Sequence, residues 1–286
     1  MTMIELNKIY NEDCLEGMKM IPDGFVDLTV TSPPYDNLRT YNGNIEQWSF
    51  EKFQGIAKEL YRVTANGGVV IWIVADATIK GSETGTSFRQ ALYFKECGFN
   101  IHDTMIWDKG GFTATGTLRA RYGSVFEYMF IFSKGKPKTF NPIKDRKNKN
   151  TSGSFHKVIR QKDGTTKSTG YTKRNEYGQR FNIWRMPGVT PKERTGHPAQ
   201  FPIALAQDHI ISWSNEGDTV LDCFMGSGTT GKMALLNNRN YIGFELDKHY
   251  CDIANERIRK ALADSTRKDY DNENTCSLRG IAGGND

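Results

Sequence analysis

The sequence predicts an α/β fold in which a mostly parallel sheet carries helices on both faces. The runs at 26–30 and 69–74 consist of apolar, largely β-branched residues, and only Asp27 in the first run breaks the pattern. Such runs are typical of strands that are buried on both sides of a parallel sheet. Between them, the segment 50–63 has apolar residues at helical spacing. A strand, a helix and a second strand in this order form the connection that parallel strands require.

Similar patterns predict the other elements of the chain. Gly67-Gly68 is expected to end the helix at 50–63. The polar segments 36–47 and 76–86 have no apolar period and are expected to be loops. The further expected strands are 8–11, 99–107, 126–132, 181–185, 218–222 and 240–245, and the further expected helices are 15–21, 88–97, 203–213, 229–236 and 247–263.

The composition excludes several classes of protein. The chain has 286 residues, which is enough for one large domain with an insertion. Its five cysteines are scattered and have no metal-site spacing, so we expect reduced thiols, a cytoplasmic location and no bound metal. No apolar run approaches the roughly 18 residues of a membrane span, and the N-terminus lacks the pattern of a secretory signal. We therefore expect no contact with a membrane.

Positive charge is concentrated in one segment, although the net charge is only +5. Residues 134–180 hold fourteen lysines and arginines against three acids, and no helical or strand period persists there. A segment of this composition cannot build its own core. Its charge favours contact with nucleic-acid phosphates, and the alternative is a solvated insertion without a partner. The candidate DNA contacts are Lys144, Arg146, Lys147, Lys149, Lys157, Arg160, Lys173 and Arg174.

These shifts in composition divide the chain into four parts. We expect a first part of the main domain at 1–133, the basic insertion at 134–185 and a second part of the main domain at 186–265. The remaining residues, 266–286, are polar and are expected to be disordered.

A proline-rich turn, Thr-Ser-Pro-Pro-Tyr at 31–35, follows the strand at 26–30. Two consecutive prolines fix φ and remove two backbone donors. What remains is a rigid turn that offers carbonyl oxygens, one hydroxyl and one aromatic ring. This set suits a flat ligand with an exocyclic amino group, at the strand end where open α/β sheets bind ligands. The alternative is an ordinary turn that ends a strand.

A glycine turn follows the strand at 218–222. Residues 221–231 read Leu-Asp-Cys-Phe-Met-Gly-Ser-Gly-Thr-Thr-Gly, which is not the phosphate loop of nucleotide triphosphatases. Glycines let the backbone approach a ligand closely, and the free N–H groups at the start of the next helix favour an anion. Glu245 ends the following strand, about 20 residues beyond the turn, where an acid suits a ribose hydroxyl pair. The alternative for Glu245 is a surface acid before a helix.

Together, Ser-Pro-Pro-Tyr and the later Asp-x-Phe-x-Gly-Ser-Gly-Thr-Thr resemble the amino-methyltransferases of DNA, in the motif order of the β class. These enzymes transfer a methyl group from S-adenosylmethionine to cytosine N4 or adenine N6. The resemblance covers residues 7–260 apart from the insertion. It implies a circularly permuted Rossmann-like methyltransferase sheet, and it implies that the basic insertion is the target-recognition region.

The resemblance also assigns the site residues. The catalytic residues would be Ser32, Pro33, Pro34 and Tyr35. The S-adenosylmethionine-binding residues would be Asp13, His197, Pro198, Asp222, Phe224, Gly226, Ser227, Gly228, Thr229, Thr230 and Glu245. Asp13 has an alternative as a helix N-cap, and His197 has one as a capping or loop histidine. The permuted order would bring Asp13, Ser32, Asp222 and Glu245 to one carboxyl edge of the sheet.

The implied reaction is direct methylation of an amine on a base that has left the duplex. The Ser32 hydroxyl and the Pro33 carbonyl would accept the hydrogens of the amine, and Tyr35 would stack on the base. Serine at the first motif position favours cytosine N4, with adenine N6 as the alternative. A catalytically idle DNA-binding scaffold is a further alternative, whereas a dehydrogenase would need a hydride-transfer site that the sequence lacks. Double-stranded DNA is the expected partner, and a homodimer and a cognate restriction endonuclease are further candidates.

Overall fold

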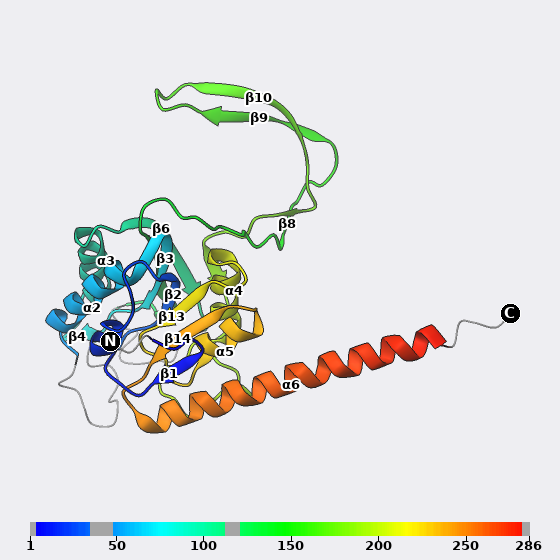
Figure 1. Cartoon of the computed structure of the whole chain (residues 1–286). Helices are drawn as coiled ribbons and strands as arrows, with labels where there is room; N and C mark the ends of the chain where they lie inside the picture. The colour runs from blue at the N-terminus through cyan, green and yellow to red at the C-terminus, as the bar shows by residue number, and fades with distance from the viewer. Residues whose placement is uncertain (1–3, 35–47, 112–120, 282–286) are drawn as a thin grey trace. The chain divides into compact units, whose positions relative to one another are not determined.

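The computed structural model describes residues 4–34, 48–111 and 121–281, with side chains as far as residue 265 (Figure 1). The chain divides into two compact units, which are treated separately below. The core unit consists of Met1–Asn141 and Ile183–Asp286, and the hairpin unit consists of Pro142–Asn182. The hairpin unit is shorter than the insertion at 134–185 that we expected. Tyr35 and the expected loop at 36–47 lie outside the described residues.

The described part of the core unit is built on an eight-stranded sheet of order β1-β14-β13-β2-β3-β7-β6-β12. All neighbouring strands run parallel except β7, which is antiparallel to both β3 and β6. The first strand therefore pairs with the last, which confirms the predicted permuted, mostly parallel α/β sheet. The strands, in the order of the sheet, are β1 Lys8–Tyr10, β14 Asn240–Phe244, β13 Thr219–Asp222, β2 Val26–Thr31, β3 Thr64–Val74, β7 Phe126–Ser133, β6 Asn100–Asp108 and β12 Ile183–Arg185.

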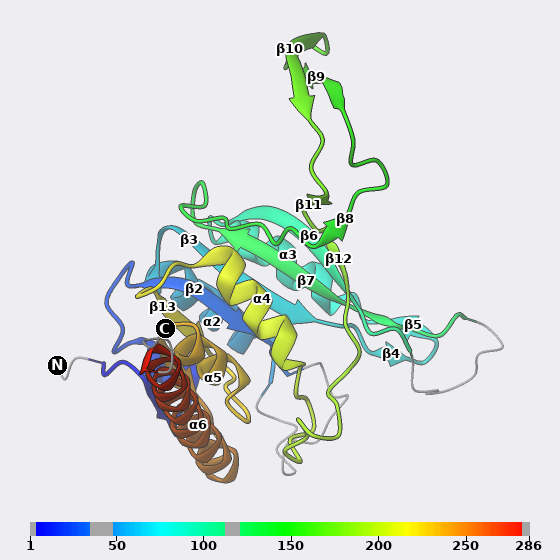
Figure 2. The same ribbon diagram turned by 90° about the vertical axis from the view of Figure 1, so that its right-hand side faces the viewer.

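Helices cover both faces of this sheet, as the sequence predicted. Figures 1 and 2 show α2 and α3 on one face and α4 and α5 on the other. The helices are α1 Cys14–Met18, α2 Phe50–Val63, α3 Thr86–Glu96, α4 Ile203–Trp213, α5 Thr229–Leu236 and α6 Lys248–Ile281.

The face under α2 shows why these residues fold as they do. Ser49 caps α2 by accepting a 3.1 Å hydrogen bond from Lys52 N. The helix buries Phe53, Ile56, Ala57, Leu60 and Val63 completely. Phe53 packs against Trp72 of β3 and Phe94 of α3, with ring centres 5.7 and 5.4 Å apart. Burial of each such side chain contributes about 1.5–3 kcal/mol. The helical spacing read from the sequence is therefore the spacing of the core contacts.

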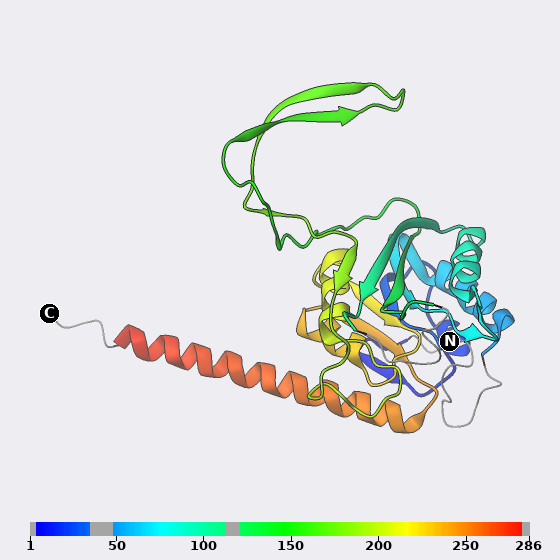
Figure 3. The ribbon, with the colours of Figure 1, turned by 180° about the vertical axis from the view of Figure 1, so that it is seen from behind.

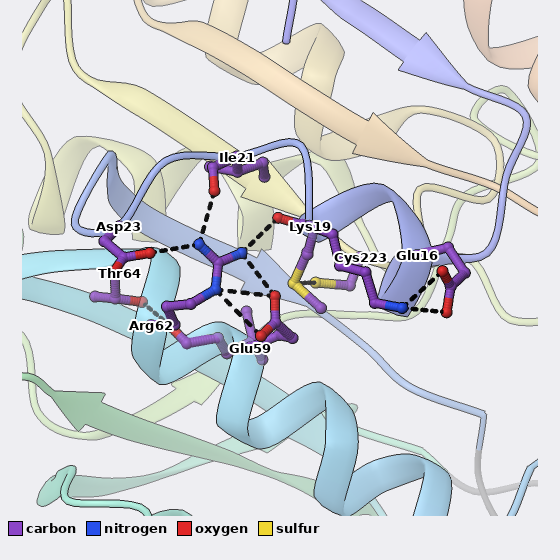
Figure 4. Close-up of polar contacts among 10 residues, drawn as sticks. Glu16, Lys19, Ile21, Asp23, Glu59, Arg62, Thr64 and Cys223 are labelled. Atoms are coloured by element: carbon purple, nitrogen blue, oxygen red, sulfur yellow. Dashed lines mark hydrogen bonds and ion pairs between the residues drawn. The ribbon is translucent and has the colours of Figure 1, made fainter. Parts of the chain in front are cut away.

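Arg62, near the end of α2, fixes the segment between α1 and β2 (Figure 4). Its guanidinium donates to the carbonyl oxygens of Met18 and Ile21 at 2.7 and 2.8 Å. It also pairs with Glu59 and Asp23, both at 2.6 Å. The hydrogen bonds that Arg62 donates to Glu59 are the main cause of its raised pKa.

Gly67 and Gly68 lie inside β3 and do not end α2, which corrects the prediction. The helix ends at Val63, because Thr64 already has an extended backbone with φ −70° and ψ 130°. Gly67 has φ +78° and donates a 2.7 Å hydrogen bond to the carbonyl oxygen of Lys134. A Cβ on Gly67 would lie 3.0 Å from the carbonyl oxygen of Lys136. The glycine is therefore required by the chain that passes over it.

Two further expectations were wrong in part. The expected loop at 76–86 contains a small hairpin of β4, Thr78–Ile79, and β5, Ser82–Glu83. Helix α6 continues to Ile281, so residues 266–281 are helical where we expected disorder (Figure 3). The sequence contains no glycine or proline between Lys248 and Arg279, so no residue in that stretch breaks the helix. Residues 282–286 lie outside the described residues.

The hairpin unit contains regular structure, whereas we expected none. Its long hairpin pairs β9, Ser154–Arg160, with β10, Thr166–Lys173, and its short pair joins β8, Arg146–Lys147, to β11, Tyr177–Gly178. Every residue of β9 and β10 is exposed. The hairpin thus forms without a core of its own, and this explains why its sequence shows no apolar alternation.

No helix among the described residues is long and apolar enough to cross a membrane.

Candidate active site

Four adjacent parallel strands, β1, β14, β13 and β2, end at the same edge of the sheet. Asp13 follows β1, Glu245 follows β14, Asp222 ends β13 and Ser32 follows β2. The structure therefore gathers these predicted residues along one carboxyl edge. Ser32 and Pro34 are half-buried there and Pro33 is buried.

Asp222 connects the proline-rich turn to the glycine turn. Its Oδ1 accepts a 2.6 Å hydrogen bond from Thr31 Oγ1 and a 3.0 Å hydrogen bond from the backbone N–H of Phe224. The residue is only 1% exposed, and burial raises the pKa of the carboxyl group. Its other oxygen, Oδ2, is buried without a hydrogen-bond partner among the described residues. The sequence analysis placed Thr31 at the start of the proline-rich turn but did not predict this contact, because a threonine at the end of a buried strand has no distinguishing pattern.

Glu245 lies where the ends of β14 and the glycine turn meet. Its Oε2 accepts a 2.7 Å hydrogen bond from the N–H of Gly226, and its Oε1 accepts a 2.8 Å hydrogen bond from the N–H of Asp247. Burial raises the pKa of this carboxyl group, even though both hydrogen bonds act to lower it. Each carboxylate oxygen retains a second lone pair, so Glu245 can also accept hydroxyl hydrogens.

Neighbouring protein atoms leave no room for a side chain at two glycines of the turn. Gly226 and Gly228 have φ of +50° and +81°. A Cβ on Gly226 would lie 3.0 Å from the ring of His197, and one on Gly228 would lie 2.7 Å from the Cβ of Ala254 in α6. Gly228 is therefore needed for packing against α6, which the sequence interpretation missed.

The polar side chains around these glycines face the protein interior. Ser227, Thr229 and Thr230 are each at most 4% exposed. Thr230 Oγ1 donates to the carbonyl oxygen of Val30 at 3.3 Å, and Arg257 donates to the backbone oxygen of Ser227 and, at 3.0 Å, to its Oγ. These contacts hold the turn against β2 and α6.

His197 joins the His-Pro segment to the glycine turn. Its Nδ1 accepts a 3.2 Å hydrogen bond from the N–H of Ala199, and its ring lies edge-on to Tyr250 with the centres 4.5 Å apart. Because the ring also borders Gly226, the structure brings this predicted residue to the turn. Pro198 is exposed beside it.

Phe224 and Asp13 complete the edge. The half-buried ring of Phe224 packs edge-on against Trp48, with centres 5.5 Å apart, and offers a flat apolar surface next to Asp222. Asp13 is the N-cap of α1, accepting from Leu15 N at 2.8 Å, and it also pairs with Lys52 at 2.6 Å. Burial acts to raise the pKa of Asp13, but the hydrogen bonds from Lys52 and Leu15 outweigh it and lower the pKa. Sequence reasoning missed Lys52, which is distant in the chain.

These groups fit S-adenosylmethionine in their chemistry. Glu245 offers acceptors for a hydroxyl pair, Phe224 offers a surface for a flat base, and Asp222 has an unpaired buried oxygen behind the turn. No cluster of three metal-ligating side chains occurs in the part of the chain whose side chains are described.

Comparisons with known proteins show the family of this chain. Residues 26–256 match the family model described as DNA methylase. The chain is 58% identical over 252 residues to the orphan methyltransferase M.BamHII of Bacillus amyloliquefaciens, covering 85% of this chain and 92% of that one. It is 30% identical over 264 residues to the DNA adenine methyltransferase YhdJ of Escherichia coli K12, covering 89% and 83%.

A solved structure shares the fold. The PvuII DNA methyltransferase, described as cytosine-N4-specific, superposes with a TM-score of 0.65 at 19% identity, covering 91% of this chain and 92% of that one. The family uses S-adenosylmethionine as its methyl donor. With the permuted sheet, the proline-rich turn and the glycine turn at one edge, the chain belongs to the DNA methylase family of S-adenosylmethionine-dependent amino-methyltransferases.

Proposed function

We propose that this enzyme transfers a methyl group to N4 of a cytosine that has been flipped out of duplex DNA. The observation that carries the proposal is the hydrogen bond between Thr31 and Asp222. This bond sets the turn that begins at Ser32 beside the glycine turn, so the amine and the methyl donor can meet at one edge. Enzymes that act on a base gain access to it by extruding it from the stack.

In this proposal the cofactor lies along the glycine turn. Glu245 accepts the ribose hydroxyls, and Phe224 contacts the adenine ring. His197, Pro198 and Gly226 border the methionine end, while Asp13 holds the start of α1. The buried side chains of Asp222, Ser227, Thr229 and Thr230, together with Gly228, shape the turn.

The proline-rich turn then positions the target base. S-adenosylmethionine supplies a methyl group already activated on a sulfonium. The lone pair of an exocyclic amine is delocalised into its ring, so acceptors for the two amine hydrogens, the Ser32 hydroxyl and the Pro33 carbonyl, favour the pyramidal, nucleophilic nitrogen. Pro34 makes the turn rigid, and Tyr35 stacks on the base. Alignment of this kind can contribute about 7–11 kcal/mol to catalysis.

The hairpin unit supplies DNA contacts in this proposal. Lys157, Arg160 and Lys173 are exposed on β9 and β10, which have no core to support, and DNA phosphates are the complementary ligand. The cations assigned to DNA are Lys144, Arg146, Lys147, Lys149, Lys157, Arg160, Lys173 and Arg174.

Adenine N6 is the second candidate for the target amine. The name of the YhdJ relative favours adenine, and the name of the structural neighbour PvuII favours cytosine. The serine at position 32 is the reason that we propose cytosine. The name of the M.BamHII relative favours an enzyme that works without a cognate endonuclease. A homodimer and a cytoplasmic location stay predictions.

Mass analysis of the product tests the base assignment. Genomic DNA is incubated with the enzyme and methyl-labelled S-adenosylmethionine and is then digested to nucleosides. We expect labelled N4-methyldeoxycytidine. Labelled N6-methyldeoxyadenosine as the sole product would contradict the cytosine assignment and leave the enzyme class intact.

A further inference from the structure

The hairpin unit contains a hollow of about 480 Å³ where the short β8–β11 pair meets the foot of the long hairpin. Arg146, Lys149, Lys173 and Arg174 line it, together with the rings of Phe155 and Tyr177. All of these residues belong to the hairpin unit, so the hollow is formed within that unit alone.

The positive charge of the hollow is not balanced by the protein. Four cations and no acid line it. This unit holds three acids. Asp145 pairs with Arg180 at 2.5 Å, and Asp163 accepts a hydrogen bond from the N–H of Thr165. Glu176 is exposed and does not line the hollow, although its neighbours Asn175 and Tyr177 do. Lys149 and Lys173 form no ion pair in the described part of the chain. Like charges that converge without a counter-charge favour an anionic ligand.

The aromatic rings that line the hollow are exposed and do not pack in a hydrophobic core. Phe155 and Tyr177 are 41% and 45% exposed. The Arg174 guanidinium lies 5.5 Å from the centre of the Phe155 ring, and Arg146 lies 4.4 Å from that of Phe181. Guanidinium groups held on aromatic faces keep their outer N–H donors free for a partner. Cations interleaved with exposed rings are the chemistry that holds a nucleotide backbone and its sugar.

The shape of the long hairpin favours duplex DNA as the nucleic acid whose backbone the hollow would hold. The major groove of DNA admits a two-stranded β-ribbon, and β9–β10 is such a ribbon with all its side chains exposed. A ribbon in a groove brings its foot to the sugar-phosphate strand that borders the groove. Phe155 and its cross-strand partner Thr172 line the hollow at that foot.

We infer that this hollow grips one phosphodiester of duplex DNA, with the phosphate on Lys149 and Lys173 and the adjacent deoxyribose on Phe155. The inference rests on the proposed function, since it takes DNA as the substrate. Such a contact positions the duplex and carries no sequence information of its own. A mixed-sequence duplex is therefore a valid probe.

The test compares two double variants of the full chain with the same loss of charge. Lys149→Gln with Lys173→Gln removes two charges from the hollow. Lys162→Gln with Lys167→Gln removes two charges from the turn and outer part of the same hairpin, away from the hollow. We expect the first pair to reduce the slope of log affinity against log salt by about 0.9, the value for one lost phosphate contact. The second pair should reduce it distinctly less. Equal reductions of the salt slope by the two double variants would overturn the inference, because they would show that DNA is attracted to the basic surface in general and not to the hollow.

A second comparison tests the ring. Phe155→Ala should weaken binding of the same duplex about tenfold at fixed salt without changing the salt slope. Val158→Ala, which truncates an exposed residue on the opposite face of β9, should weaken it less. An equal loss from both would remove Phe155 from the site. Both comparisons measure DNA binding alone, so their outcome is independent of whether the wild-type enzyme yields a methylated base.

Discussion

Thr31 Oγ1 lies 2.6 Å from Oδ1 of Asp222, and this hydrogen bond joins the last residue of β2 to the last residue of β13. Ser32 follows Thr31 directly, and Phe224 follows Asp222 by two residues. The bond therefore ties the proline-rich turn to the glycine turn, which in the proposed function hold the base and the cofactor.

Thr31→Val should destabilise the protein, since it removes a hydrogen bond to a buried carboxyl group while keeping the shape of the side chain. We expect a loss of about 1–3 kcal/mol in the free energy of unfolding, measured by urea denaturation. Thr29→Val is the matched control on the same strand. Thr29 is fully buried, and its hydroxyl has no partner among the described residues, so its loss should be neutral or stabilising. Equal losses from the two variants would mean that the Thr31–Asp222 bond has no special role.

Gly228→Ala should destabilise the enzyme more than Gly85→Ala. Both glycines are helix N-caps with positive φ, at +81° and +66°. A Cβ on Gly85 would meet nothing within 4 Å, so that variant carries only the left-handed backbone cost of about 1–2 kcal/mol. A Cβ on Gly228 would also displace α6 at Ala254. Denaturation curves with similar losses for both variants would contradict the packing role of Gly228.

S-adenosylmethionine affinity should weaken on acidification because of Glu245. Burial holds the pKa of this group above its usual 4.5, so it binds its proton at a higher pH than an exposed glutamate. An ionised carboxylate accepts hydroxyl hydrogens best, so affinity should be full above the raised pKa and fall as the pH drops through it. Acidification has the opposite effect on folding stability. Because the folded state raises the pKa of Glu245, this group stabilises the folded protein below pH 4.5, and that contribution is lost as the pH rises through the raised pKa.

Calorimetric titration across this pH range checks the Glu245 prediction. Glu245→Gln should bind the cofactor more weakly and with a flatter pH dependence. If the variant keeps the pH dependence of the wild type, another group is responsible and Glu245 is not the ribose ligand.

Local periodicity was enough to predict much of the core unit. The bounds of α2, α4 and α5 agree with the predicted ranges, because their apolar positions repeat at helical spacing between clear polar or glycine borders. The permuted strand order that the family resemblance implies also predicted that Asp13, Ser32, Asp222 and Glu245 would lie at one edge. The helix bounds depend on neighbours in the sequence, whereas the strand order came from the resemblance.

The contacts that local patterns do not encode were missed. Thr31 and Asp222 are separated by 191 residues, and Lys52 and Asp13 by 39, so nothing nearby in the sequence indicates these pairs. The hairpin unit gave no strand signal, because both faces of its ribbon meet solvent and apolar and polar residues need not alternate.

The most direct test of the central claim measures single-turnover methyl transfer and cofactor affinity together in Ser32→Ala. In the proposed function the variant loses one acceptor for the amine but keeps the turn and the Pro33 carbonyl. Transfer should slow by roughly tenfold to a hundredfold, as loss of about 1–3 kcal/mol implies, with S-adenosylmethionine affinity unchanged. Tyr35→Ala should slow it further by removing the stacking surface, and Thr29→Val should not slow it. An unchanged transfer rate in Ser32→Ala, or the absence of any methylated base with the wild-type enzyme, would contradict the account.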